Sequence, residues 1–281
     1  MKKTNSRLKH VLRKWYVIPV VIICLLIAAN INKTPEVDYI HADWLYNPGD
    51  PQSFPYIAAL QDFVFVGYVV SDPIPVQLGT NDNYSIFSEY KVRVLMNIRG
   101  ELETGIDIPV LKDGGYDKKH NKYFLFENDS LPRKGEICVI AASTMTDGSY
   151  RLSTCGFTSF AAIGIPYSMM DKESMILSNG TEIDQDDVKR SIDRAENPFE
   201  EKIISLKSVE YIDNVADVDQ GLVVPDELLK KPDSPEIRSV LGKSTLVKLW
   251  IAAVAEENEV ESKRERIMDS PYGIPGSPSY T

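Results

Sequence analysis

The residue types most used for acid–base and metal chemistry are scarce in this chain. It has three histidines and three cysteines in 281 residues. His10 lies in a basic N-terminal stretch, and His41 and His120 lie in polar, irregular segments, as is typical of solvated loop residues. The motifs H-E-x-x-H, C-x-x-C and G-x-S-x-G do not occur. The sequence therefore offers no zinc ligand set and no serine nucleophile in a recognisable setting.

One acidic cluster has the composition of a calcium site. Its members are Glu182, Asp184, Asp186 and Asp187. The cluster lacks the glycine and the terminal glutamate of an EF-hand loop. Acids at this spacing also suit the positive end of a helix, and we interpret Asp184 as the cap of a helix from residue 185 toward residue 195.

Two further patterns imitate sites of known chemistry. The run Gly242 to Thr245 (GKST) resembles the end of a phosphate-binding loop, but the glycine that such a loop needs upstream is Ile237 here. A helix that stops at Gly242 and a new helix capped by Ser244 explain the run better. Glu101 and Glu103 flank a turn without the partners of a glycosidase pair. We therefore expect no catalytic residue, no metal and no cofactor, and a protein that is not an enzyme.

The first 33 residues predict where the protein works. Six Lys/Arg and no acid precede an apolar run, and Lys14 and Lys33 bracket 18 uncharged residues. As a helix these rise about 27 Å, close to the thickness of a hydrocarbon core. We expect a cytoplasmic tail at 1–14, a membrane anchor at 15–32 and the remainder outside the cell. Trp15 and Tyr16 suit the membrane interface, Pro19 lies in the first turn, and Ile31 ends the run.

A cleaved signal peptide is the alternative to this single-pass anchor in the cell membrane. Cleavage needs small residues just before the cut. Only Ala29 meets this need, and Ile27 upstream of it is a poor match. We therefore favour a retained anchor over secretion after cleavage.

Charge limits the partners of the exported part. The chain carries −10, and because its first 15 residues carry +6, the rest carries −16. Such an acidic surface repels phosphates, so we expect no nucleic-acid partner. The expected partners are membrane lipid, through the N-terminal helix, and an unidentified envelope component or protein.

Two cysteines flank a predicted hairpin. Asp147-Gly148 lies at the centre of a two-residue turn between Cys138 and Cys155. That turn places position 157 opposite Cys138 and makes Cys155 a diagonal neighbour on the same face. A disulfide between Cys138 and Cys155 and two buried thiols are both open, and a bridge would only brace the fold.

The predicted fold is mainly β with an α appendage. We expect a linker over 33–61, a β domain over 62–165, a helical region over 166–268 and a disordered tail over 269–281. The run 62–71 is almost continuously apolar, as in a strand covered on both faces, and an irregular loop follows it over 72–88. In the next strand Tyr90, Val92, Val94, Met96 and Ile98 should share one face. Further strands are expected near 106–110, 123–126, 135–144 and 150–160.

Helices are expected after residue 166. Ser234-Pro235 has the pattern of an N-cap and first helical residue. A longer helix follows from about Ser244, and its apolar face holds Leu246, Leu249, Trp250 and Ala253. The apolar part of that helix is too short to span a bilayer, so we expect it to pack on the β domain.

The β segment resembles a family. The strings FVFVGYVV, YKVRVLMNIRGEL, IPV before Gly114-Gly115, and GEICVIAA are similar in order to those of uncharacterised exported proteins of Gram-positive bacteria. These in turn resemble the OB-fold of netrin modules and tissue inhibitors of metalloproteinases. The resemblance implies a small OB-like barrel over roughly 60–162. It does not carry over inhibition, which uses an N-terminal cysteine, because 34–61 contains none. OB-folds also bind nucleic acids through aromatic and basic platforms, and Tyr90, Lys91 and Arg93 offer one here.

Three functions follow as hypotheses. The first is a non-enzymatic, membrane-anchored protein that binds a partner through loops 72–88 and 112–122, the longest irregular connections. The second is a structural component of envelope assembly. The third is an extracytoplasmic hydrolase acting through two carboxylates, which requires convergent acids of raised pKa.

Overall fold

A computed structural model of the chain describes residues 34–40, 53–80, 83–126, 130–145, 152–154, 160–171, 175–196, 204–206 and 221–268. The chain divides into two units, Met1–Val37 and Asp38–Thr281, and the fold below is that of the second. The predicted anchor, with Trp15, Tyr16, Pro19 and Ile31, lies outside the described residues, as does the predicted tail 269–281. Among the helices that are described, none is both long enough and apolar enough to cross a bilayer.

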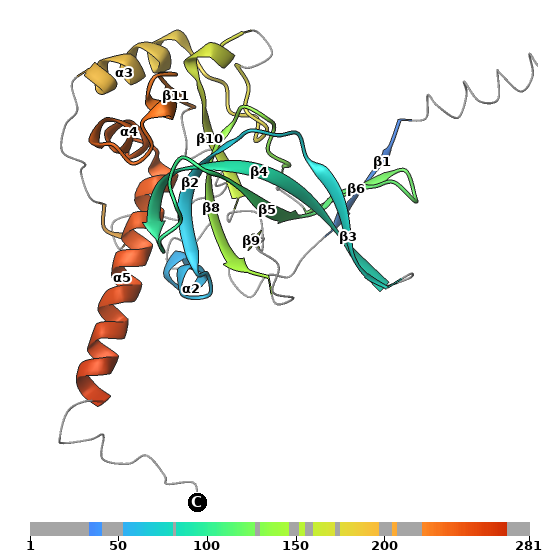
Figure 1. Ribbon diagram of the computed structural model, residues 1–281, viewed down its shortest axis with the longest axis horizontal. Coiled ribbons are helices and arrows are strands. Elements are labelled where there is room, and N and C mark those ends of the chain that lie inside the picture. The colour runs from blue at the N-terminus through green and yellow to red at the C-terminus, as the bar shows by residue number, and fades with distance from the viewer. Residues whose placement is uncertain are drawn as a thin grey trace, which may run out of the picture. The chain divides into compact units, whose positions relative to one another are not determined.

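The described part is strand-rich, with few helices, as the sequence predicted (Figure 1). Its larger sheet has the strand order β11-β10-β8-β2-β4-β5-β9, with β3 paired to β4. Short β9 pairs with β5 in parallel and also with β8 in antiparallel orientation. The described strands do not form a closed barrel. The strands of this sheet are β2 (Phe63–Val69), β3 (Ile74–Thr80), β4 (Asn83–Arg99), β5 (Asp107–Asp113), β8 (Ile137–Thr144), β9 (Leu152–Thr154), β10 (Phe160–Pro166) and β11 (Leu222–Val224).

Strand β2 is covered on both faces, as its apolar sequence predicted. Val64 and Val66 belong to the hydrophobic cluster under the helices, whereas Phe65 belongs to a second cluster on the opposite face. Gly67 lies where β2 packs most tightly: a Cβ atom there would lie 2.3 Å from Cγ1 of Val92. A larger residue at this position would push the two strands apart.

The helices α2 (Ser53–Ala59), α4 (Pro235–Leu241) and α5 (Thr245–Met268) pack over the first of these clusters. The predicted apolar face of α5 is confirmed, because Leu246, Leu249, Trp250 and Ala253 are all buried there. The ring of Trp250 meets that of Phe54 in α2 edge to face, at 5.0 Å between centroids. Nη1 of Arg99 in β4 donates to O of Ala58 at 2.6 Å and to Oε2 of Glu257 at 2.8 Å. β4, α2 and α5 are thus joined by polar as well as apolar contacts.

Helix α2 corrects the prediction of an irregular linker over 33–61. Phe54, Ile57 and Ala58 are spaced as the buried face of a helix, and all three belong to the core. β1 (Glu36–Ile40) lies in the same predicted linker. The prolines of this segment suggested irregular structure, but Pro55 lies in the first turn of α2, where proline costs a helix little.

The face prediction for β4 is right only for its first half. Tyr90, Val92 and Val94 share the second cluster, but Met96 lies in the first cluster together with its neighbour Leu95. The pairing of β4 with β2 shifts register between Val66 and Gly67. This bulge at Leu95 switches the side chains that follow to the other face.

The predicted loop over 72–88 is instead a β-hairpin. β3 and the first part of β4 pair in register from Ile74 opposite Glu89 to Thr80 opposite Asn83. The prolines and glycine of this segment are compatible with β3 because it lies at an edge, where one side of the strand needs no partner. The sheet therefore extends through the segment that was predicted to be a loop.

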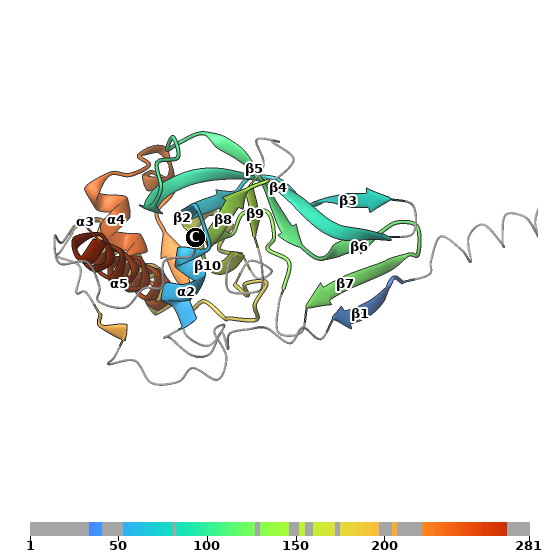
Figure 2. The same ribbon diagram turned by 90° about the horizontal axis from the view of Figure 1, so that it is seen from below.

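A second, three-stranded sheet lies beside this hairpin. Its order is β1-β7-β6, with β6 (Gly115–Asp117) and β7 (Lys122–Phe126) joined by a tight turn. Both views place the β3–β4 hairpin, β6 and β7 away from α3 (Gln185–Glu196), α4 and α5 (Figures 1 and 2). The helices thus brace one end of the fold, and the strands alone build the other.

The predicted register around Cys138 is wrong. Cys138 lies opposite Ala162 in β10 and opposite Gly67 in β2, not opposite position 157. Only the last two residues of β8 pair with β9, so most of β8 pairs with the strand after it. Strand β10 buries Phe160 and Ile163 and has seven residues, against three in β9, so it offers β8 a longer partner.

The region after residue 166 is helical but also completes the sheet. Strand β11 pairs in parallel with β10, from Gly164 opposite Leu222 to Pro166 opposite Val224. Short 3-10 helices lie at Tyr167–Met169 and Leu228–Lys230. The predicted cap at Ser234 is confirmed, because its Oγ accepts from the backbone N–H of Ile237 at 3.3 Å. The helices and the sheet therefore share one core.

Candidate functional site

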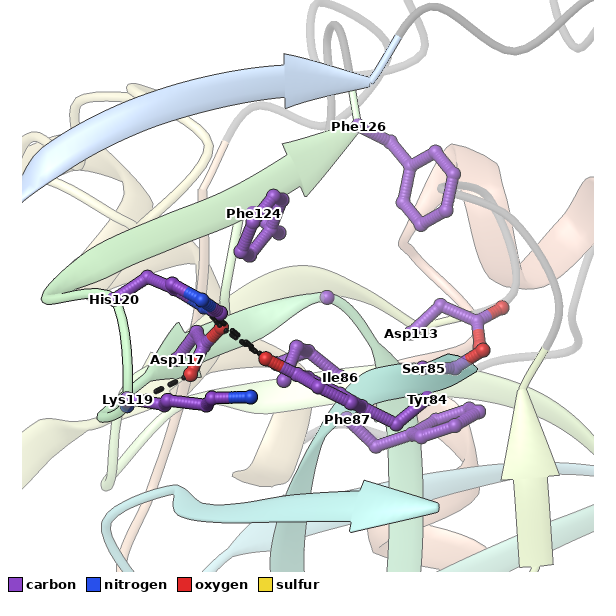
Figure 3. A pocket seen from close by; sticks show the side chains of 11 residues that line it. Tyr84, Ser85, Ile86, Phe87, Asp113, Asp117, Lys119, His120, Phe124 and Phe126 are labelled. Carbon is purple, nitrogen blue, oxygen red and sulfur yellow. Dashed lines mark hydrogen bonds and ion pairs between the residues drawn. The ribbon is translucent and has the colours of Figure 1, made fainter. Parts of the chain in front are cut away.

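A pocket of about 560 Å³ lies where the β3–β4 hairpin meets β6 and β7, a size typical of small-ligand sites. Phe124 and Phe126 of β7 lie on one side of it and Tyr84, Ile86 and Phe87 of β4 on the other (Figure 3). His120, Asp117 and Lys119 gather at one end, and Asp113 lies at the opposite end. Its lining residues are Tyr84, Ser85, Ile86, Phe87, Asp113, Gly114, Asp117, Lys119, His120, Phe124 and Phe126.

Gly114 and Gly115, where β5 ends and β6 begins, bring the two hairpins together. Gly114 and Gly115 have φ angles of 85° and 145°, which favour glycine. The N–H of Gly114 donates to O of Ile86 at 3.0 Å, and Oγ of Ser88 donates to O of Gly114 at 3.0 Å. A Cβ at Gly115 would lie 2.4 Å from that same Oγ. The close approach of β6 to β4, and with it the pocket, depends on these two glycines.

Asp117 is the polar centre of the end that also holds Lys119 and His120. Its side chain is 1% exposed and accepts four hydrogen bonds. Oδ2 accepts from the Tyr84 hydroxyl at 2.8 Å and from His120 Nδ1 at 2.5 Å. Oδ1 accepts from Gln77 Nε2 at 3.2 Å and from the Lys119 N–H at 2.8 Å. The four donors come from β3, β4 and the β6–β7 turn, so Asp117 ties these elements together.

Hydrogen bonding keeps this carboxylate ionised. Burial by itself raises the pKa of Asp117, but the bonds from His120, Tyr84 and the Lys119 N–H outweigh burial and lower that pKa to about 2. All four donors favour the charged form. Asp117 therefore acts as a fixed anion that positions its neighbours.

The neighbours of Asp117 are oriented by it. An ionised carboxylate only accepts, so the hydrogen bond requires the proton of a neutral His120 to lie on Nδ1. The Tyr84 hydroxyl lies 3.1 Å from the same Nδ1. Nζ of Lys119 lies 5.8 Å from the centroid of the Tyr84 ring, within cation–π range. This end of the pocket is thus charged and internally paired.

The prediction that the binding face lies near 72–88 and 112–122 stays a prediction. Residues from both predicted connections, 72–88 and 112–122, line the pocket. His120 lies in the β6–β7 turn with a half-exposed side chain, as predicted for a loop histidine, and its Nδ1 is in addition paired with buried Asp117. The signal that could have found this pair is their spacing of three residues in a tight turn.

The aromatic and basic platform proposed for β4 does not form a surface. Tyr90 is fully buried and its ring packs against Phe160, at 5.2 Å between centroids. Nε of Arg93 is paired with Oδ1 of Asp107 at 2.8 Å, and Lys91 is exposed. Tyr90 and Lys91 are consecutive in the strand and point to opposite faces, so the buried Tyr90 ring does not form one platform with Lys91 and Arg93.

The acidic cluster around Asp184 is a helix start, as predicted. Oδ1 of Asp184 accepts from the backbone N–H of Asp187 at 2.7 Å, and Asp187 pairs with Arg190. Glu101 and Glu103 are both exposed. Within the described residues, no three His, Cys, Asp or Glu side chains come together as metal ligands.

The GKST run is also explained by helix ends, as predicted. Gly242 follows α4, and its N–H donates to O of Arg238 at 2.9 Å. Oγ of Ser244 accepts from the N–H of Val247 at 3.1 Å and caps α5. Because Ser244 is buried in this role, it belongs to the fold.

Glu136 is a second buried carboxylate. It lies outside the pocket and joins two parts of the fold. It accepts from the N–H and the hydroxyl of Ser178 at 2.6 and 2.7 Å, and from N and Nε of Arg133 at 2.9 and 3.0 Å. Two chain segments 42 residues apart are joined by this one side chain. Charge-assisted bonds of this kind are among the stronger ones in proteins.

The cysteine pair remains a prediction. Cys138 is a fully buried free thiol in the structure, and Cys155 lies outside the described residues. Burial raises the pKa of the Cys138 thiol, and nearby Glu136 raises that pKa further. A thiol of raised pKa in such a place is a poor nucleophile.

Comparison with known proteins found no match, either among protein-family models or among curated proteins.

Proposed function

We propose that this chain is a single-pass membrane protein whose exported part binds a partner outside the cell and has no catalytic activity. The N-terminal run 15–32 serves as the anchor, with the basic residues 1–14 on the cytoplasmic side. The binding site is the pocket between the β3–β4 hairpin and β6–β7. The observation that carries this proposal is the pocket itself, because two segments about 30 residues apart fold together to enclose it.

The chemistry of the pocket favours binding over catalysis. A hydrolase acting through carboxylates needs a protonated acid, and hence a raised pKa. The pKa of Asp117 is instead lowered to about 2. Asp117 also accepts four hydrogen bonds already, which leaves it poorly placed to accept a further proton or a metal ion.

We also propose that the β part is an OB-like barrel related to exported Gram-positive proteins. The pairings β8–β2, β2–β4, β4–β5 and β5–β9 support this, because they link five strands in one order, and β9 meets β8 again over only two residue pairs, as in a partly open barrel. Five strands of this kind are what an OB-fold contains. The fold by itself says nothing about the partner.

The test blocks the pocket without touching its polar end. Ser85 is exposed at the pocket rim, so Ser85→Trp should fill the opening and leave the core intact. Lys91→Trp is the matched control, since it places the same side chain on an exposed position of the same strand, outside the pocket.

The readout is partner recovery from intact cells. Proximity labelling from a tag at residue 281 identifies the neighbours, and chemical cross-linking measures how much of each neighbour is captured. We expect Ser85→Trp to lower the capture of at least one neighbour several-fold and Lys91→Trp to leave it unchanged. Equal capture by both folded variants and the wild type would show that the pocket is not the binding site.

A further inference from the structure

One ring nitrogen of His120 makes no hydrogen bond within the described part of the chain. Nδ1 of His120 lies 2.5 Å from Oδ2 of buried Asp117 and 3.1 Å from the Tyr84 hydroxyl, whereas Nε2 has no such partner among the described residues. The two nitrogens of an imidazole ring point in widely different directions, so Nε2 faces away from Asp117. The His120 side chain is half-exposed and lines the pocket.

The bond to Asp117 makes this second nitrogen a hydrogen-bond acceptor. The pKa of Asp117 is lowered to about 2, so its carboxylate is ionised and can only accept. In neutral His120 the proton therefore lies on Nδ1, and Nε2 carries the lone pair. A carboxylate bonded to one nitrogen also fixes the ring and makes the other nitrogen more basic. The pocket thus contains an oriented acceptor whose position is set by Asp117.

The same pocket has apolar walls. Phe124 and Phe126 of β7 lie on one side, and Ile86 and Phe87 of β4 lie on the other (Figure 3). Walls of this kind favour an apolar ligand body, because its burial releases water from both surfaces. A ligand without a donor, however, would take water away from Nε2 of His120 and replace no hydrogen bond. A hydroxyl group on an apolar body meets both requirements.

The charged groups beside His120 favour a neutral ligand. Asp117 and Lys119 lie at the same end of the pocket, and both have partners within the protein. A cation at His120 would face the ammonium group of Lys119, and an anion would face the carboxylate of Asp117. The residues after the first 15 carry −16, which repels anions further.

We propose that the pocket binds a neutral ligand through a hydroxyl group that donates to Nε2 of His120, with the apolar body of the ligand against the walls. This inference rests on the proposed function, because it names the chemistry that the same site recognises. His120 is the residue that contacts the ligand, and Asp117 is a positioning residue. Free phenols and the tyrosine side chains of proteins both offer this chemistry.

Matched probes test the proposal on the full chain in detergent at pH 8, where histidine is ordinarily neutral. 4-Methylphenol has the hydroxyl donor, and 4-methylanisole, its methyl ether, has none. Binding is measured by calorimetry and by ligand-observed NMR. We expect 4-methylphenol to bind about three- to tenfold more tightly than the ether. N-acetyltyrosinamide separates the sources: tighter binding than 4-methylphenol supports a tyrosine of a protein partner, and weaker binding supports a free phenol.

Two variants show whether His120 is the acceptor. His120→Phe keeps a ring but removes Nε2, so the preference for 4-methylphenol over its ether should disappear. Lys118→Phe is the matched control, since Lys118 is exposed in the same turn and does not line the pocket. This control should keep the preference unchanged.

A second measurement uses the unaltered chain, because His120→Phe also removes a hydrogen bond to Asp117. Nitrogen-15 NMR of the histidine rings reports which nitrogen carries the proton, and the signals of His120 are those that His120→Phe loses. We expect the proton on Nδ1, and we expect the Nε2 signal to shift when 4-methylphenol binds. A proton on Nε2 in the ligand-free protein would overturn the proposal.

The outcomes distinguish this inference from the proposed function. The hydroxyl proposal is wrong if 4-methylphenol does not bind, if the methyl ether binds as tightly, or if His120→Phe keeps the preference. Binding of the ether that Ser85→Trp abolishes would still support the pocket as a binding site. Only an unchanged partner capture by Ser85→Trp on cells would overturn the proposed function itself.

Discussion

The replacement Asp117→Asn tests the electrostatic account of the pocket. The amide has nearly the shape of the carboxylate but only one acceptor oxygen, so its NH2 group would face two of the four donors. Hydrogen bonding lowers the pKa of Asp117 from 3.8 to about 2. At about 1.4 kcal/mol per pKa unit, the ionised form contributes about 2 kcal/mol to folding. In a domain of this size that loss lowers Tm by about 4–8 °C.

The effect has a defined pH dependence. Because the pKa is lower in the folded state, the contribution is complete above the unfolded pKa of 3.8 and is lost as the pH falls through about 2. The difference in unfolding free energy between wild type and Asp117→Asn should be constant from pH 7 to 5 and should shrink between pH 4 and 2. Denaturation followed by circular dichroism across this range measures it.

A matched control is Asp107→Asn. Asp107 is also paired with a basic side chain, Arg93, but the pair is more than a third exposed, so its loss should cost little. The account is refuted if Asp117→Asn is as stable as the wild type at pH 7. It is also refuted if the deficit stays the same at pH 2, since the loss would then not come from the ionised carboxylate.

Three further replacements test the fold. Gly164→Ala should lower the free energy of unfolding by about 2 kcal/mol or more, because the new Cβ would lie 2.0 Å from O of Leu222. A chemical denaturation midpoint equal to that of the wild type would contradict the β10–β11 pairing. Glu136→Gln should lower the free energy of unfolding by about 2 kcal/mol, since the NH2 group of the amide would face the donors of Ser178 or Arg133. An unchanged free energy of unfolding in the same assay would show that these hydrogen bonds do not stabilise the fold. Phe54→Ala should cost about 3–5 kcal/mol by leaving a cavity beside Trp250, and Tyr56→Ala, at an exposed position of α2, should cost less than 1 kcal/mol.

Those parts of the fold that depend on local pattern could be predicted from the sequence. The burial of β2 on both faces followed from its apolar run, and the caps at Ser234 and Ser244 followed from residue type. Helix α2 also carried a local signal, the spacing of Phe54, Ile57 and Ala58, but the prolines of the segment 34–61 obscured this signal. Its stability comes from packing on α5, which is distant in the sequence.

Features that depend on pairing over long distances could not be predicted. The register of Cys138 depends on which later strand offers β8 the longer partner, and the bulge at Leu95 depends on the fit between β2 and β4. The register of β8 and the position of the bulge in β4 are both determined by packing across the sheet. A turn signal alone cannot decide between them.

For the candidate site, the sequence prediction and the structure agree only in that residues of 72–88 and 112–122 line the pocket. Gly114 and Gly115, at the junction of β5 and β6, have φ angles that favour glycine. The only local signal for the role of His120 was its spacing of three residues from Asp117. The hydrogen bond that Asp117 accepts from Tyr84, 33 positions away, could not be predicted from residue spacing along the chain.

The central claim is that this pocket faces the outside of the cell, and site-directed labelling tests it most directly. Glu103→Cys places a thiol at an exposed position of the strand-rich part, and Ser6→Cys places one in the predicted cytoplasmic tail. On intact cells freed of their wall, a membrane-impermeant maleimide should label Glu103→Cys, and it should label Ser6→Cys only after lysis. Labelling of Glu103→Cys only after lysis would contradict the account.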